Sequence, residues 1–199
     1  MKNCNLKSEN GRSMIEMLGV LAIIGVLSVG GIAGYSKAMM KYRINKTIEQ
    51  ITLVSQNVKS FFAPQKNFKG LNGLNTGGLK IIKKAKLVPE DMIFDDHLED
   101  LWGGWITLES AGDGFAYVFI DASMMPEEAC IEIISQDWNI AGFKYIHTYN
   151  SSNDYIAKVP VSVENAVRMC SPTYLIAFYY NFDLKADWVE GGDPYVYLE

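Results

Sequence analysis

Two histidines, His97 and His147, are the side chains of this chain best suited to transfer protons near neutral pH. Neither stands at a recognisable spacing from the nucleophile or carboxylate partners that catalysis requires. The sequence also contains no nucleophile elbow, no phosphate-binding loop and no zinc-ligand pattern. We therefore expect a protein that is not an enzyme and that binds no cofactor and no metal ion.

An acidic run, DDHLED, occupies residues 95–100 and offers carboxylate oxygens of the kind that bind calcium. It lacks the glycine and the ligand alternation of a calcium-binding hand, so we interpret it as a solvated acidic turn. The formal net charge is −5, and the one basic cluster is short. Its members are Lys80, Lys83, Lys84 and Lys86. Because phosphate binding needs many clustered basic side chains, no nucleic-acid partner is expected.

The three cysteines are divided by a strongly apolar segment, with Cys4 before it and Cys130 and Cys170 far beyond it. If this segment sends the following chain across a membrane, Cys4 stays in the reducing compartment and the other two cysteines can pair. Three unrelated buried thiols are the alternative.

The apolar segment runs from Met17 to Ser36 without a charged residue. As a helix, these 20 residues (17 to 36 inclusive) would span about 30 Å, the thickness of a bilayer core. The segment is therefore a membrane helix or an export signal. A typical secretory signal has a shorter apolar stretch with a small-residue cleavage site behind it, and the one such candidate here is Gly31-Ile32-Ala33.

The residues that open this segment, Gly11-Arg12-Ser13-Met14-Ile15-Glu16, follow a polar leader. This order resembles the processing site of type IV prepilins. The resemblance implies that a prepilin peptidase cuts after Gly11 and that the new N-terminus at Arg12 is methylated. It also implies that Glu16 acts in assembly. Arg12 departs from the family, which usually has an apolar residue at this position.

Glu16 needs a physical explanation, because an acid at mid-bilayer costs about 2.5–3.5 kcal/mol and less near the interface. The resemblance implies that its carboxylate pairs with the N-terminal amine of its own or a neighbouring subunit once helices stack in a filament. The alternative is a flanking charge that reaches the lipid headgroups and needs no partner.

A second apolar pattern follows, with apolar residues at spacings of three or four along one face of an amphipathic helix. They are Met40, Ile44, Ile48, Ile51, Val58 and Phe62. No glycine or proline lies between Tyr35 and Ala63, so this helix can continue from the apolar segment until Pro64 ends it. A coiled coil is an alternative interpretation of the same pattern.

The remaining chain alternates predicted strands and short helices. We expect a helix at 79–85, a hairpin of strands 105–109 and 115–121, and a helix that opens at Pro126 and carries Cys130. A strand at 143–149, a helix at 163–169 capped by Ser162 and a last strand at 174–182 complete the pattern. The predicted fold class is α+β, with the long helix packed on an antiparallel sheet.

These boundaries divide the chain into a leader at 1–11, an N-terminal helix at 12–63 and a globular region at 64–199. The helix has a membrane and filament-core part at 14–36 and an amphipathic part at 37–63.

The order of these elements is similar to that of the type IVb pilins, the group of the toxin-coregulated and bundle-forming pili. The segments LVPEDM at 87–92 and WGG at 102–104, and the positions of Cys130 and Cys170, carry the resemblance. It implies a Cys130–Cys170 disulfide and a chain that polymerises with itself into a helical filament for adhesion or aggregation. The implied partners are the prepilin peptidase, the inner-membrane pilus assembly machinery and, before assembly, membrane lipid. The implied location is the inner membrane, with the globular region in the periplasm, and then an extracellular pilus.

Three other functions remain open. The chain can be a pseudopilin or minor pilin of a type II secretion or DNA-uptake system, which shares the N-terminal features. It can also be an exported soluble protein cleaved after Ala33, or a membrane-anchored periplasmic protein. Aromatic residues near the C-terminus form either an adhesive or inter-subunit surface or part of the core. They are Tyr174, Tyr179, Tyr180, Trp188, Tyr195 and Tyr197.

Overall fold

The structure, a computed structural model, describes residues 14–73, 76–111, 114–149, 154–171, 173–181 and 195–198. The chain divides into two compact units, Met1–Lys41 and Tyr42–Glu199. We call them the N-terminal unit and the head unit and describe each by itself. The expected leader at 1–11 lies outside the described residues.

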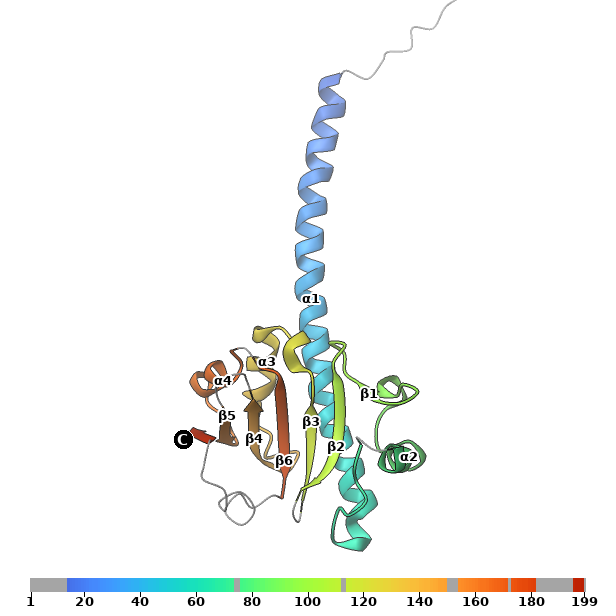
Figure 1. Cartoon of the computed structure of the whole chain (residues 1–199). Helices are drawn as coiled ribbons and strands as arrows, with labels where there is room; N and C mark the ends of the chain where they lie inside the picture. The colour runs from blue at the N-terminus through green and yellow to red at the C-terminus, as the bar shows by residue number, and fades with distance from the viewer. Residues whose placement is uncertain are drawn as a thin grey trace, which may run out of the picture. The chain divides into compact units, whose positions relative to one another are not determined.

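The first helix, α1 (Met14–Phe62), is continuous from the apolar segment into the amphipathic one, as predicted (Figure 1). Glu16 lies in its first turn and Lys59 in its last, where each charge is favourable for the helix dipole. A short 3₁₀ turn, Ala63–Gln65, follows and contains Pro64, which cannot continue the α-helical hydrogen-bond ladder. The helix therefore ends at the place that the sequence predicts.

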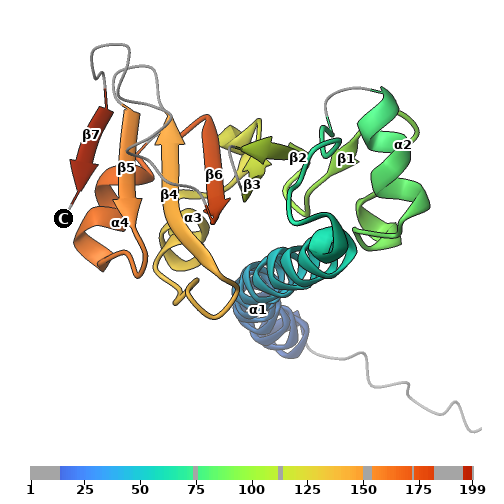
Figure 2. The ribbon, with the colours of Figure 1, turned by 90° about the horizontal axis from the view of Figure 1, so that it is seen from below.

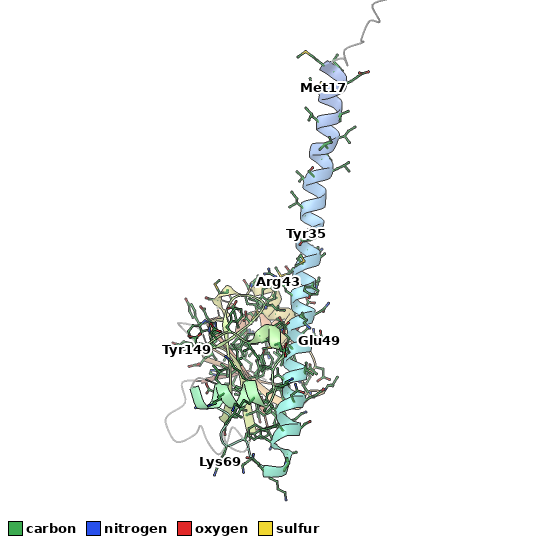
Figure 3. The ribbon with its side chains drawn as sticks, turned by 90° about the vertical axis from the view of Figure 1, so that its right-hand side faces the viewer. Met17, Tyr35, Arg43, Glu49, Lys69 and Tyr149 are labelled. Carbon is green, nitrogen blue, oxygen red and sulfur yellow. A yellow bond between two sulfur atoms is a disulfide. The ribbon has the colours of Figure 1, made fainter. Side chains whose placement is uncertain are left out.

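Within the head unit, α1 buries one face made of residues three or four positions apart. The buried residues are Ile44, Thr47, Gln50, Ile51, Val54, Ser55, Val58 and Phe62. Figure 3 shows this part of the helix, marked by Arg43 and Glu49, beside the rest of the head unit. The coiled-coil alternative is wrong for this part of the chain, because its apolar face packs on the unit's own sheet.

The sheet has seven strands in the order β1-β2-β3-β6-β4-β5-β7. The first six are antiparallel to their neighbours, whereas β7 pairs with β5 in parallel. Their bounds are β1 (Leu98–Glu99), β2 (Trp105–Ala111), β3 (Gly114–Phe119), β4 (Phe143–Tyr149), β5 (Asp154–Lys158), β6 (Leu175–Tyr180) and β7 (Tyr195–Leu198). Figure 2 shows the helix along one face of this sheet. The predicted α+β fold is thus present, with one parallel edge strand added.

In the described part of the chain, three further α-helices flank the sheet: α2 (Thr76–Lys84), α3 (Glu127–Ile134) and α4 (Val163–Met169). Ser162 caps α4, because its hydroxyl accepts a hydrogen bond from the Asn165 amide at 3.2 Å. In Figures 1 and 2, α2 lies beyond β1 at one end of the sheet, while α3 lies beside β4 and β6.

Aromatic rings fill the space between the sheet and its helices. Trp138, which follows α3, packs edge-on against Phe178 of β6 with 4.9 Å between ring centroids, and its indole N–H donates to the Ile133 carbonyl at 2.8 Å. Phe115 and Phe143 extend the same ring cluster. This cluster fixes the position of the segment after α3 against the centre of the sheet.

The predicted hairpin, the strand at 143–149 and the helix at 163–169 are confirmed, the last two with the predicted bounds. The predicted strand at 174–182 is β6, but it is not the last strand, because β7 follows it. The short strands β1, β5 and β7 were not predicted.

Candidate functional site

The expected processing residues Gly11 and Arg12 lie outside the described residues. Glu16 is described, exposed in the first turn of α1. It is the one charged residue from Met14 to Ser36. Along this stretch the large apolar side chains are 53–83% exposed. Residues 14–36 thus present an apolar surface interrupted by one carboxylate.

This segment is long and apolar enough to cross a membrane, with a mean hydropathy of 2.2 over an 18-residue stretch. Its helix also carries five glycines: Gly19, Gly25, Gly30, Gly31 and Gly34. Apart from the helix's own nearby backbone, a Cβ placed at any of them would meet no atom within 4 Å. Glycine surfaces of this kind let another helix approach closely in lipid or in a bundle.

A disulfide joins Cys130 of α3 to Cys170, the residue that ends α4, with 5.8 Å between their Cα atoms. Both cysteines are 3% exposed. The pairing that the resemblance implied is therefore present. It ties two short helices that the chain separates by a hairpin, β4 and β5.

The acidic run at residues 95–100 is not wholly solvated. The interpretation as a solvated turn is wrong for its last residue, Asp100, which is buried. Its Oδ1 accepts hydrogen bonds from the amides of Trp102 at 2.7 Å and Gly104 at 3.0 Å, and its side chain is buried. Burial raises the pKa of Asp100 to about 6, although the backbone donors oppose the shift. This carboxylate closes the turn that leads into β2. Its signal in the sequence is an Asp two residues before Trp-Gly-Gly, the spacing of an Asx turn.

Glycine is required at Gly104 for close packing. A Cβ there would lie 2.5 Å from the Asp121 carbonyl oxygen and 3.1 Å from Oδ2 of Asp100. The neighbouring Gly103 has a φ of +88°, a conformation that L-residues rarely adopt. The WGG segment of the sequence is thus a structural turn.

Both histidines have carboxylate partners, which sequence spacing did not reveal. His147 of β4 pairs through Nε2 with Oδ1 of Asp154 on β5 at 2.7 Å, and burial lowers its pKa. His97 Nδ1 lies 2.7 Å from Oδ1 of Asp96, and its ring stacks between Phe94 and Trp105. In the described part of the chain, no group of three or more metal-ligating side chains is placed to hold a metal ion.

A comparison with protein-family models matches residues 41–177 to the family described as PilS N terminal. The chain belongs to this family. The match spans well over half of the 199 residues, and the family is pilin-related. Neither the comparison with curated proteins nor that with solved structures gave a significant match.

The PilS N-terminal match covers most of the head unit and begins at the amphipathic part of α1. It includes both disulfide cysteines and the Asp100 turn, whereas Gly11 and Glu16 lie before it. The match and the prepilin-like motif are therefore independent observations from separate parts of the chain.

We expect Asp100→Asn to stabilise the PilS-like head unit at pH 7.5 by about 1–3 kcal/mol, because ionised Asp100 is held in a buried site. Its folded pKa of about 6 lies above the usual 3.8, so the cost is present above pH 6 and vanishes as the pH falls toward 4. Asparagine keeps an oxygen for the amides of Trp102 and Gly104. Urea unfolding of the detergent-solubilised chain at pH 7.5 and pH 4.5 measures the difference.

The exposed Asp95→Asn variant is the matched control and should change stability little at either pH. A stabilisation by Asp100→Asn of equal size at both pH values would show that the titration of Asp100 is not its cause.

Proposed function

We propose that this chain is a structural subunit of a type IV pilus, of the type IVb kind, which polymerises into a surface filament. One observation carries the proposal: a head unit of a pilin-related family is joined in one chain to a single exposed apolar helix that begins with a lone acid. A soluble binding protein has no need of such a helix after export, whereas a filament subunit needs it twice. It holds the subunit in lipid first and fills the filament core later.

In this proposal, a prepilin peptidase removes residues 1–11 and the amine of Arg12 becomes the methylated N-terminus. Glu16, four residues further along, then faces an amine that must lose water when the helices stack. The carboxylate compensates that amine within the subunit or on its neighbour. The inner-membrane assembly machinery draws the subunit out of the bilayer, and the globular region passes from the periplasm to the outside. We assign the chain no catalytic activity.

The packing of α1 on the head unit suits a subunit that bears tension. Besides the buried apolar face, three side chains of α1 reach backbone carbonyls of the head unit. Ser55 donates to Ala141 at 2.9 Å, Asn57 to Leu87 at 3.2 Å and Lys59 to Ala141 at 3.0 Å. These polar contacts, one from Ser55 within the buried face and two from the partly buried Asn57 and Lys59, resist sliding of the helix along the sheet. Force applied to the helix is thus transmitted to the head unit.

The test is to shear filaments from cells that express the chain and to identify their subunit. We expect the chain in the sheared fraction, without residues 1–11, and the same fraction to contain fibres by electron microscopy. A chain that stays in the membrane or periplasmic fraction while fibres are absent would overturn the proposal.

A further inference from the structure

Three aromatic rings form a stack on the surface of the head unit, at the end of the sheet where β1 and α2 lie (Figure 2). The His97 ring lies between that of Phe94, with 5.4 Å between ring centroids, and that of Trp105, with 4.8 Å. Trp105 is 51% and Phe94 45% exposed. Because His97 covers one face of each, this exposure leaves much of the remaining ring surface open to a partner. We call the three rings the aromatic stack.

Carboxylates surround the aromatic stack. Oδ1 of Asp96 lies 2.7 Å from Nδ1 of His97, and Oε2 of Glu99 lies 3.6 Å from Nε2 of the same ring. The contact with His97 lowers the pKa of Asp96, so this carboxylate keeps its charge at neutral pH, and its side chain is 87% exposed. Asp95 adds a third carboxylate, against one positive charge from Lys83. The surroundings of the rings are therefore negative.

The backbone holds the aromatic stack in place. Lys83 Nζ donates hydrogen bonds to the carbonyl of Phe94 at 2.5 Å and to that of the next residue at 2.8 Å. The Phe94 amide donates to the His97 carbonyl at 3.0 Å, and Glu99 pairs with Trp105 in the ladder between β1 and β2. A surface that is fixed before binding loses little conformational freedom when a partner arrives.

The packing of the head unit does not account for these exposed rings. On β2, Ile106 and Leu108 are buried in the core, whereas Trp105 at the start of the strand is exposed. A large ring that stays half in water contributes less to folding than a buried one. Exposed aromatic side chains gathered at one place are typical of interaction sites.

The chemistry of the surface selects a cation. Aromatic faces attract positive charge through the ring quadrupole, and the neighbouring carboxylates add to that attraction. An open ring with carboxylates at its edge suits a planar guanidinium, which stacks on the ring and donates hydrogen bonds sideways to a carboxylate. We propose that the aromatic stack binds an exposed arginine of a partner protein. Its guanidinium lies on Trp105 and donates to Asp96 and Glu99.

The arginines in the described part of this chain already have partners. Cζ of Arg43 lies 5.7 Å from the ring centroid of Trp102, and Nη2 of Arg168 lies 2.7 Å from Oε1 of Glu164. The arginine therefore comes from another protein. The inference goes beyond the proposed function and does not depend on polymerisation.

Three short peptides that carry arginine, lysine or citrulline at the same positions test this site on the full chain in detergent. Citrulline keeps the planar shape and N–H donors of arginine but has no charge. The indole N–H signal of Trp105, identified by its loss in Trp105→Phe, should move in the NMR spectrum with the arginine peptide, while that of the buried Trp138 stays fixed. The arginine peptide should bind at least about threefold more tightly than the lysine peptide and tenfold more tightly than the citrulline peptide.

Two variants separate the contributions of ring and charge. Trp105→Ala and Asp96→Asn/Glu99→Gln should each weaken binding of the arginine peptide at least about fivefold, measured by fluorescence anisotropy of a labelled peptide. The matched control, Glu127→Gln/Glu128→Gln, removes the same charge at exposed positions on α3 and should keep the affinity within about twofold. Circular dichroism shows whether each variant is folded.

Equal affinity for the three peptides, a Trp105 signal that the arginine peptide does not move, or wild-type affinity in the folded Asp96→Asn/Glu99→Gln variant would overturn this site. None of these results bears on filament formation, so the proposed function is tested separately.

Discussion

Cells that carry Glu16→Val should make the subunit but lose surface filaments, to below about a tenth of the wild-type number. In the proposed function the carboxylate is a cost in the bilayer, so its removal should leave membrane insertion and the proposed processing after Gly11 intact. In the filament core the N-terminal amine then has no compensating charge, a loss of about 3–5 kcal/mol per subunit. Electron microscopy at matched subunit levels measures the effect.

Glu16→Asp is the matched control, because it retains the charge and should retain filaments. The head unit should be unaffected in both variants, since Glu16 belongs to the other unit of the chain. Wild-type fibre numbers in Glu16→Val cells would show that Glu16 merely flanks the membrane helix, which is the alternative that the sequence leaves open.

Replacing both disulfide cysteines, Cys130→Ser/Cys170→Ser, should lower the free energy of unfolding of the head unit by about 4 kcal/mol. The bond closes a loop of 41 residues (a sequence separation of 40, counting both ends), and that closure restricts the unfolded chain. A loss of this size is a large share of the stability of an ordinary domain. Urea unfolding followed by tryptophan fluorescence measures it.

Cys4→Ser provides the control, because Cys4 belongs to the proposed leader and should have no effect on the mature chain. If the proposed function holds, the double variant should also reach the surface in lower amounts, since unfolded subunits are removed by proteases. Unfolding at the same urea concentration with and without the disulfide would show that α3 and α4 are held by packing alone.

The sequence predicts α1 well because two physical signals agree along it. The charge-free stretch gives the membrane part, and the three-to-four spacing from Ile44 to Phe62 gives the face that packs on the sheet. The spacing does not reveal that Thr47 and Gln50 are buried as well. Thr47 satisfies its hydroxyl at the Arg43 carbonyl of its own helix, whereas the Gln50 amide is 3.4 Å from Oδ2 of Asp91, a contact that depends on the tertiary fold.

The strands β5 and β7 could not be predicted for a different reason. Both are short, and β5 carries a charge at each end, Asp154 and Lys158. Asp154 lies opposite Tyr149 and reaches His147 diagonally on the neighbouring strand, so a residue type that disfavours strands here makes a side-chain pair. β7 depends on β5 for its hydrogen bonds, because a four-residue parallel strand has no independent stability.

The features of the candidate site could be predicted only where their signal lies within one short stretch of the sequence. Cys130, Cys170 and the exposed apolar helix follow from residue type and order. The burial of Asp100 depends instead on how the turn before β2 folds over the acidic run. Surfaces built from segments distant in the sequence leave no periodic signal.

The mass of the intact subunit in sheared filaments tests the central claim most directly. The proposed function predicts a chain that begins at Arg12, with one methyl group added, and that has 188 residues, the 199 of the precursor less the first 11. The same mass should show Cys130 and Cys170 joined, two hydrogens lighter than the reduced chain. A subunit that retains Met1, one that begins between Ser13 and Tyr35, or filaments that do not contain this chain would contradict the account.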